Sequence, residues 1–161
     1  MKAQSIREYF CFLAQQHCQV RHNPDGDIHF SSLLEEAQNL YARKMHYPCV
    51  VLNTADYDGF TSNIMSRTAS LLFLDHCKDS GDYDRVKAIF DTTENIMKDF
   101  IRRMMRDKAK GEPVVSRISQ EQMEAHQIYL ESAGLYGWVL FFVVPEFLNT
   151  KDCDNVFDDG K

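Results

Sequence analysis

Residues 83–109 read YDRVKAIFDTTENIMKDFIRRMMRDKA, and this stretch decides the fold. Its apolar side chains recur every three or four positions from Val86 to Met104, and charged side chains fill most of the remaining positions. This spacing is typical of a helix that buries one face and exposes the other. Gly111 and Pro113 follow at positions where such a helix ends. We therefore predict one long amphipathic helix whose apolar stripe packs on a sheet.

Extended apolar segments lie on both sides of this helix in the sequence. Residues 48–54 and 67–77 precede it, and residues 121–131 and 137–144 follow it, as four expected strands. The run CVVL at residues 49–52 is apolar at successive positions, which favours an interior strand. The order of elements predicts an α+β fold: a mostly antiparallel sheet of about four strands, with the long helix packed on one face.

Polar or glycine-containing segments are expected to separate these elements. Residues 56–59 (DYDG) and 134–137 (GLYG) have the composition of turns, and Pro145 is expected to stop the last strand. Nearer the N-terminus, residues 5–8 (SIRE) have the form of a capping box, which predicts a helix over residues 6–19.

The remaining segments complete a single domain over residues 1–148. We expect a short strand at residues 27–30, a second N-terminal helix at residues 32–44, and a loose acidic tail at residues 149–161. The core is expected to hold the apolar stripe of the long helix and the inward side chains of the strands. These are Leu72, Leu74, Val86, Phe90, Ile96, Met97, Phe100, Ile101, Val139, Phe141 and Val143.

Composition limits the classes of partner. The chain has 161 residues, of which 44% are hydrophobic, and this suits one globular domain. Its net charge of −6, with Lys and Arg mixed among Asp and Glu, argues against nucleic acid as a specific partner. No apolar run approaches the roughly 20 residues that span a bilayer, and MKAQSIREYF lacks a signal peptide's apolar core, so we expect no membrane partner. Five scattered cysteines are expected to be reduced thiols of a cytosolic protein.

The strongest nucleophile candidate is Cys77, which follows Asp75 and His76. Successive side chains of a strand point to opposite faces, so His76 is not expected to serve as the base for Cys77. A catalytic pair would need a histidine from elsewhere in the chain.

Acidic residues offer a second candidate site. Asp56 and Asp58, with Asp75 or Glu131, could form an acid/base pair or a magnesium site, although the DYDG order is also what a turn favours. The six histidines make no HxH or HxxxH pair, and the chain lacks a glycine-rich phosphate loop and a GxSxG elbow. We therefore expect no catalytic residue, no cofactor and no metal, and a protein that is not an enzyme.

Three features of the chain from Tyr47 onward belong together. They are a Tyr47-Pro48 strand opening before a loop with Asp56, Tyr57 and Gly59; a hydrophobic strand at residues 68–76 that leads through Gly81-Asp82 into the long helix; and the GLYG turn before a strand with Trp138 and Phe142. With these features the chain resembles the tail terminator and related head–tail joining (minor tail) proteins of long-tailed bacteriophages. Members typically place an N-terminal helix before this core, whereas the second helix and the acidic tail depart from the pattern.

The resemblance implies a subunit of a hexameric ring that caps a finished tail tube and offers a surface to the head, without catalysis. Its partners would be copies of itself and other tail or neck proteins, in the host cytoplasm during assembly and in the virion tail afterwards. We expect Tyr57, Asp58, Phe60 and Ile64 to contact these partners, because Phe60 and Ile64 have no periodic partner that would bury them. Two alternatives stay open: another tube or neck component of similar fold, and a small cytosolic α+β ligand-binding protein or enzyme.

Overall fold

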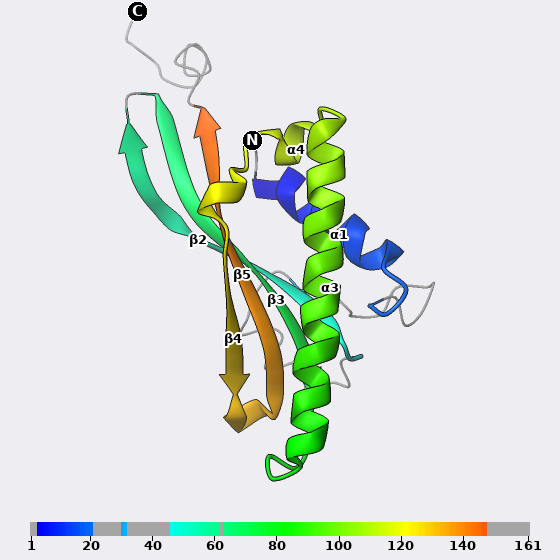
Figure 1. The fold of residues 1–161 in the computed structure, drawn as a ribbon. Coiled ribbons are helices and arrows are strands. Elements are labelled where there is room, and N and C mark those ends of the chain that lie inside the picture. Colours follow the sequence, from blue (N-terminus) through cyan, green and yellow to red (C-terminus); the bar gives the residue numbers. More distant parts are fainter. Residues whose placement is uncertain (1–2, 21–29, 32–45, 62, 148–161) are drawn as a thin grey trace, which may run out of the picture.

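The computed structural model describes residues 3–20, 30–31, 46–61 and 63–147 (Figure 1). Helices and strands follow the order expected of an α+β fold, which the structure confirms. The longer elements are α1 (Ala3–Gln16), β2 (Cys49–Thr61), β3 (Ile64–His76), α3 (Tyr83–Ala109), β4 (Glu124–Leu130) and β5 (Leu135–Phe147). Short elements are β1 (Phe30–Ser31), α4 (Pro113–Ser116) and the 3-10 turns Gln120–Gln122 and Glu131–Ala133.

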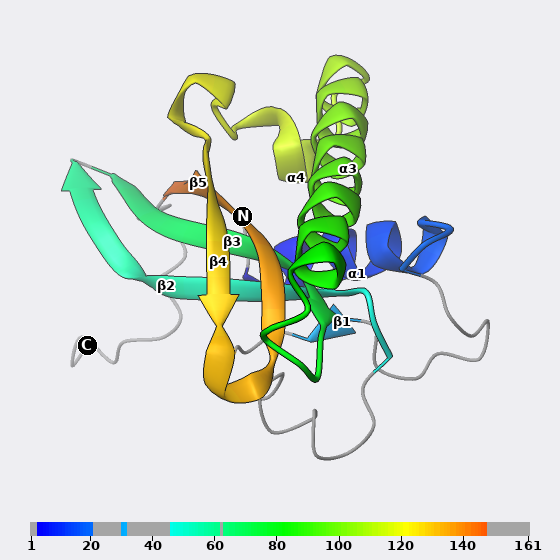
Figure 2. The same ribbon diagram turned by 60° about the horizontal axis from the view of Figure 1, so that its bottom comes forward.

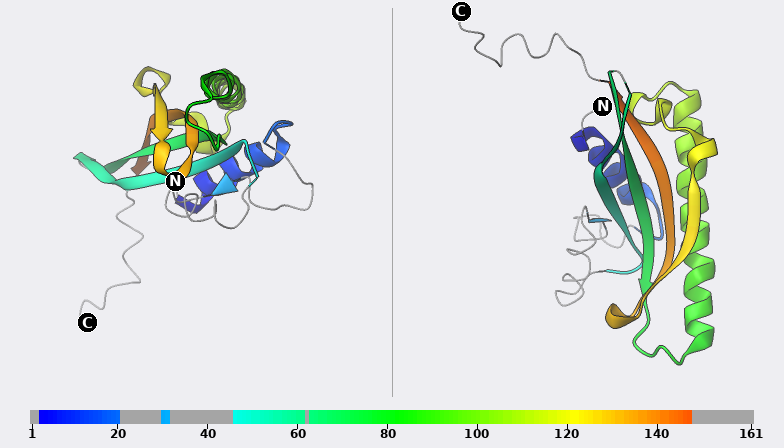
Figure 3. Two further views of the ribbon diagram at one scale, coloured as in Figure 1. Left: turned by 90° about the horizontal axis from the view of Figure 1, so that it is seen from below. Right: turned by 90° about the vertical axis from the view of Figure 1, so that its left-hand side faces the viewer.

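The strands form one five-stranded sheet in the order β1-β2-β3-β5-β4. Two hairpins, β2–β3 and β4–β5, are joined by the antiparallel pairing of β3 with β5, and only β1 runs parallel to its neighbour. The right-hand view of Figure 3 shows β2, β3, β5 and β4 in succession, with α3 running along their length. The sheet is therefore mostly antiparallel, as the sequence predicted.

Helix α3 begins and ends where its sequence pattern predicts. Asp82 caps it, because its carboxylate accepts a hydrogen bond from the backbone N–H of Arg85 at 3.1 Å. At the other end Gly111 adopts a positive φ of 80°, and Pro113 starts the separate helix α4. The stripe that α3 buries includes Ile89, Ile96, Met97, Phe100 and Met104.

The main core lies between this stripe and alternate residues of the central strands. Phe73 and Phe100 meet edge to face with ring centroids 5.1 Å apart, and Phe10 of α1 lies 5.5 Å from Phe142 of β5. Val115 and Ile118 close the same cluster at the end of α3. Helices α1, α3 and α4 thus share one core with β2, β3 and β5.

The opposite face of the sheet is also apolar. Cys49, Val51, Leu72, Leu74 and Val139 form a second buried cluster there. Since Val50 and Leu52 belong to the main core, β2 is buried on both faces. The prediction that CVVL is an interior strand is confirmed, because β2 lies between β1 and β3.

Several predicted boundaries are wrong, chiefly because the strands are longer than expected. Residues 56–59 are not a loop: β2 continues through them and pairs with β3 as far as Thr61 opposite Ile64. Register shifts between Thr54 and Tyr57 and between Tyr57 and Gly59 accommodate the turn-like composition as bulges.

Both ends of the last strand, β5, differ from the prediction. The turn closes at Gly134, whose φ is 64°, and β5 begins at Leu135, so Tyr136 and Gly137 lie in a strand. Pro145 does not stop β5, which continues to Phe147. The pairing of β4 with β5 ends at Phe141, so β4 is not beside β5 at Pro145. The missing N–H of Pro145 therefore costs no hydrogen bond to β4.

Near the N-terminus, α1 replaces the predicted helix over residues 6–19. Because it already includes Ala3, Ser5 lies inside the helix and is not its cap. The predicted second helix at residues 32–44 and the acidic tail lie outside the described residues, and of the strand predicted at residues 27–30 only Phe30 is described, in β1. The strand predicted within residues 121–131 is confirmed as β4.

Most of the predicted core is buried. Six of the named side chains are buried: Leu72, Leu74, Ile96, Met97, Phe100 and Val139. Val86, Phe90, Ile101 and Phe141 are partly buried and pack against the clusters, whereas Val143 is partly buried outside them. Among the described residues, no helix is long and apolar enough to cross a membrane.

Candidate functional site

The four predicted contact residues lie at the far end of the β2–β3 hairpin. Tyr57 pairs with Arg67, Phe60 with Met65, and Ile64 with Thr61. Ile64 is half-buried, whereas the side chains of Tyr57, Asp58 and Phe60 are outside the described part of the structure. The backbone therefore brings the four positions together, in two paired strands and not in a loop.

This end of the hairpin projects beyond the core. We call residues 53–61 and 63–68 the hairpin arm. None of its described side chains belongs to the three buried clusters, and residues 64–68 are all half-buried. Figure 2 shows the arm extending away from α1, α3 and α4. The arm therefore extends the sheet away from the helices, and its half-buried side chains keep part of their surface exposed.

The second exposed feature is strand β4, which lies last in the sheet order. Glu124, Ala125, His126 and Gln127 are exposed, and the side chain of Tyr129 keeps 54% of its surface exposed. The Tyr129 ring also contacts α3, because it lies edge-on to the Phe90 ring with centroids 5.2 Å apart. The strand was predicted, but its position at the sheet edge was not. The sequence of a seven-residue strand does not show whether the strand will pair on one side or on both.

The cysteine considered as a nucleophile lies in a structural corner. The Cys77 thiol is buried and donates a hydrogen bond to the carbonyl oxygen of Asp79 at 3.1 Å. Asp75 is also buried, and its carboxylate accepts from the backbone of His76 at 2.7 Å and from Arg85 at 3.3 Å. The Arg85–Asp75 pair holds the end of β3 against the start of α3, and the other two hydrogen bonds fix the chain between them.

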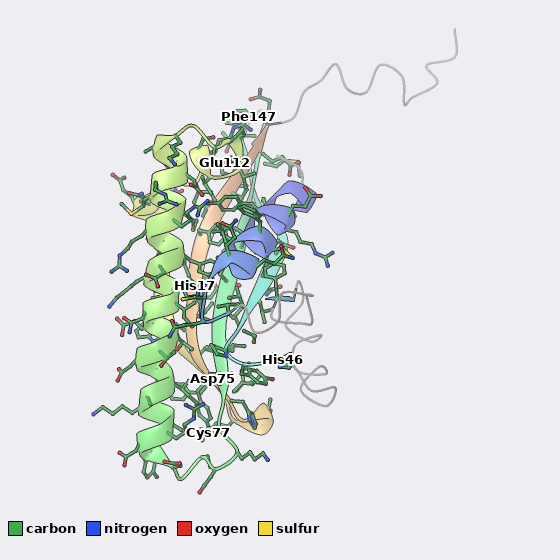
Figure 4. All side chains as sticks on the ribbon, turned by 90° about the vertical axis from the view of Figure 1, so that its right-hand side faces the viewer. His17, His46, Asp75, Cys77, Glu112 and Phe147 are labelled. Atoms are coloured by element: carbon green, nitrogen blue, oxygen red, sulfur yellow. The ribbon has the colours of Figure 1, made fainter. Side chains whose placement is uncertain are left out.

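His76 lies on the other side of the strand, as the alternation predicted. Its ring stacks at 5.7 Å on Tyr47, and not on Cys77, which packs with Ile89 and Tyr136. Burial lowers the pKa of His76, partly opposed by the nearby Asp75 carboxylate. Figure 4 shows Asp75 and Cys77 toward one end of α3, with His17 farther along and Glu112 and Phe147 at the other end. These polar and sulfur groups are therefore spread along the molecule.

Three side chains that were not predicted as site residues join α1 to α3. The Tyr9 hydroxyl donates to Asp107 at 2.9 Å, and the Arg103 Nε donates to both Asp107 oxygens at 3.0 and 2.8 Å. The four-residue spacing of Arg103 and Asp107 on one helix is a recognisable signal, but Tyr9 is too distant in sequence to be assigned. A groove of about 470 Å³ lies beside this network, lined in part by Phe12 and Lys110.

Burial and hydrogen bonding act together on this network. Burial raises the pKa of Tyr9, and its hydrogen bond to Asp107 raises it further, so the phenol keeps its proton. Burial alone would raise the pKa of Asp107, but hydrogen bonds from Arg103 and Tyr9 outweigh it and the pKa is lowered. Asp107 is therefore a charged hydrogen-bond acceptor. Its donors are Tyr9 of α1 and Arg103 of α3, so it holds these two helices together.

Other predicted site residues do not come together. Asp56 and Asp58 lie in β2, with side chains outside the described part, whereas Asp75 pairs with Arg85. In the described ranges no group of three histidine, cysteine or acidic side chains is arranged to hold a metal ion. Trp138 is half-buried, and its indole N–H donates to the Phe90 carbonyl oxygen at 3.2 Å, which ties β5 to α3.

Comparison of the chain with family models, with curated proteins and with solved structures found no match.

Proposed function

We propose that this protein is a structural subunit of the tail-terminator type, which assembles with copies of itself into a ring that caps a phage tail tube and joins it to the head. The proposal includes no catalytic step, no nucleic-acid specificity and no membrane partner. Its partners are other copies of the chain and other tail or neck proteins, in the host cytoplasm and then in the virion tail.

The observation that supports this proposal is the hairpin arm. The paired strands of the arm, with β3 also paired to the end of β5, give a subunit a stiff surface with which to reach its neighbour. Ile64 and Met65 at its end are half-buried, so apolar surface remains there for a partner to cover. A ring needs such a surface on one subunit and a different receiving surface on the next.

The α1–α3 groove favours a ligand-binding role less well. Its most buried charge, Asp107, already accepts hydrogen bonds from Tyr9 and Arg103. These pairs hold the subunit's own helices together, so Arg103 and Asp107 are engaged within the subunit. Assembly through exposed surfaces therefore fits the described side chains better than ligand binding in this groove.

The experiment that tests this proposal replaces two apolar side chains at the end of the arm. We expect Phe60→Asp combined with Ile64→Asp to abolish ring formation and leave the subunit folded, because buried charge at an interface is costly. Light scattering gives the assembled mass, and circular dichroism gives the helix and strand content.

A matched control places the same charge outside the arm. Phe12 of α1 keeps 47% of its surface exposed, and we expect Phe12→Asp to preserve the ring. Loss of fold in the arm variant would show that Phe60 and Ile64 are core residues. An intact ring in that variant would contradict the assignment of the arm as the contact surface.

A further inference from the structure

Strand β4 presents an open edge of the sheet. One side of the strand pairs with β5 along all seven residues, from Glu124 opposite Phe141 to Leu130 opposite Leu135. On its other side no strand of the described chain follows in the sheet order. In Figure 1, β4 lies beyond β5 on the side away from β3. Its outward backbone N–H and C=O groups are therefore available to another strand.

The devices that usually block an exposed edge are missing from β4. The strand contains neither proline nor lysine, and its pairing with β5 has no register shift. Helix α3 does not extend over the strand's first half, since Ala125 and Gln127 are exposed. A regular, uncovered edge of seven residues is a template for strand addition.

We propose that β4 pairs with β4 of a second copy of this chain, antiparallel and about a two-fold axis that passes by Gln127. The pair goes beyond the proposed ring, because it uses a different edge of the sheet from the hairpin arm. A two-fold axis also joins subunits that face opposite ways, so this contact links two rings or two free subunits.

The side chains of β4 complement themselves in this register. Gln127, whose side-chain oxygen accepts a hydrogen bond from the Tyr129 hydroxyl at 3.1 Å, lies opposite its own copy, where its amide N–H groups can donate across the axis. Tyr129 lies opposite Ala125 of the other copy, so a large exposed ring meets a small side chain. Glu124 lies opposite Leu130, and no two like charges face each other.

The surface beside the edge extends the contact. A hollow of about 360 Å³ lies next to the start of β4, lined by Glu124, His126, Phe141 and Val143 among others. Phe141 and Val143 are only partly buried there. The half-buried Leu130 of the second copy lies on this side of the sheet opposite Glu124, at the margin of this hollow.

The opposite edge of the sheet is a poorer partner for β4. Strand β1 already pairs with Val50 and Val51 of β2. Farther along, β2 has two register shifts between Thr54 and Gly59, which interrupt any regular run as long as β4. The strand that best fits β4 in length and regularity is β4 itself.

Charge exchange at the two-fold axis tests the pairing and its register together. Gln127→Glu and Gln127→Lys each place like charges opposite each other, whereas an equal mixture of the two variants places Glu opposite Lys. Sedimentation over a dilution series should show that either variant alone raises the dissociation constant of the pair about tenfold, and that the mixture returns it to the wild-type value. Gln127 is exposed, so the fold should tolerate both variants.

Gln15 of α1 is the matched control, because it is also an exposed glutamine. Gln15→Glu and Gln15→Lys should leave the dissociation constant at the wild-type value. A wild-type chain that never self-associates would overturn the pairing, and so would Gln127 variants that behave as wild type or a mixture that fails to recover.

This result is separable from the outcome for the ring. If the Phe60→Asp, Ile64→Asp variant loses the ring but stays a dimer that Gln127→Glu weakens, both proposals stand. Gln127 variants that keep the wild-type dissociation constant of the pair, in a protein that still forms rings, overturn the β4 pairing alone. A β4 dimer in a protein that never forms rings overturns the ring alone.

Discussion

At the residue scale, Gly137 determines how closely β5 approaches β3. A Cβ built at this position would overlap the carbonyl oxygen of Phe73, so no other residue fits without a shift of backbone. From composition alone Gly137 is expected in a turn, because glycine favours turns. Composition cannot distinguish a glycine that bends the chain from one that lets two strands meet, since the second role depends on a neighbour distant in sequence.

Replacement of Gly137 tests this close approach. We expect Gly137→Ala to lower the free energy of unfolding by about 3 kcal/mol, because backbone must move to admit the methyl group. Gly59→Ala is the control: its Cβ would meet Ser66 at an ordinary 3.5 Å, and we expect a change within about 0.5 kcal/mol. Urea unfolding measures both values, and equal effects would contradict the account.

At the scale of elements, a helix or strand is easier to predict when its apolar pattern repeats over more residues. Helix α3 could be predicted to its last residue because 27 positions repeat one apolar stripe between clear caps. The arm could not, because Asp58 and Gly59 favour turns locally while the pairing with β3 extends the strand. The contact between α1 and α3 through Tyr9 and Asp107 was also out of reach, since 98 positions separate them.

The joint between these two helices gives a prediction about pH. Because the pKa of Asp107 is lower in the folded chain than its ordinary value, the joint's stabilisation is fully present above that ordinary value and is lost as pH falls through the folded pKa. We expect Asp107→Asn to cost about 2 kcal/mol at neutral pH, as for a hydrogen bond to a charged group, and much less near pH 2.

Thermal or urea unfolding of Asp107→Asn and wild type, repeated between neutral and acidic pH, measures this difference. Asp99→Asn is a suitable control, because Asp99 lies on the same helix and its side chain is 47% exposed. Exposed pairs contribute little, so its effect should stay within about 1 kcal/mol at every pH. A pH-independent cost of Asp107→Asn would contradict the joint as described.

At the scale of the whole molecule, the two surfaces proposed for contact lie at separate places. The hairpin arm projects past the core, and β4 forms the free edge beyond β5. The buried Asp75 and the partly buried Asp107 are engaged in holding elements together. The four contact residues stay a prediction. The sequence placed them in a loop, whereas the structure has them in the paired strands β2 and β3, because strand length depends on pairing that a single segment does not reveal.

The mass of the purified wild-type chain in solution, measured by light scattering over a wide range of concentration, tests the central claim most directly. The account predicts a closed ring whose mass is a fixed multiple of 18.7 kDa and which does not fall apart on dilution. At higher concentration the only further species is the pair of rings that β4 links, with twice that mass. A species of 18.7 kDa at every concentration would contradict it.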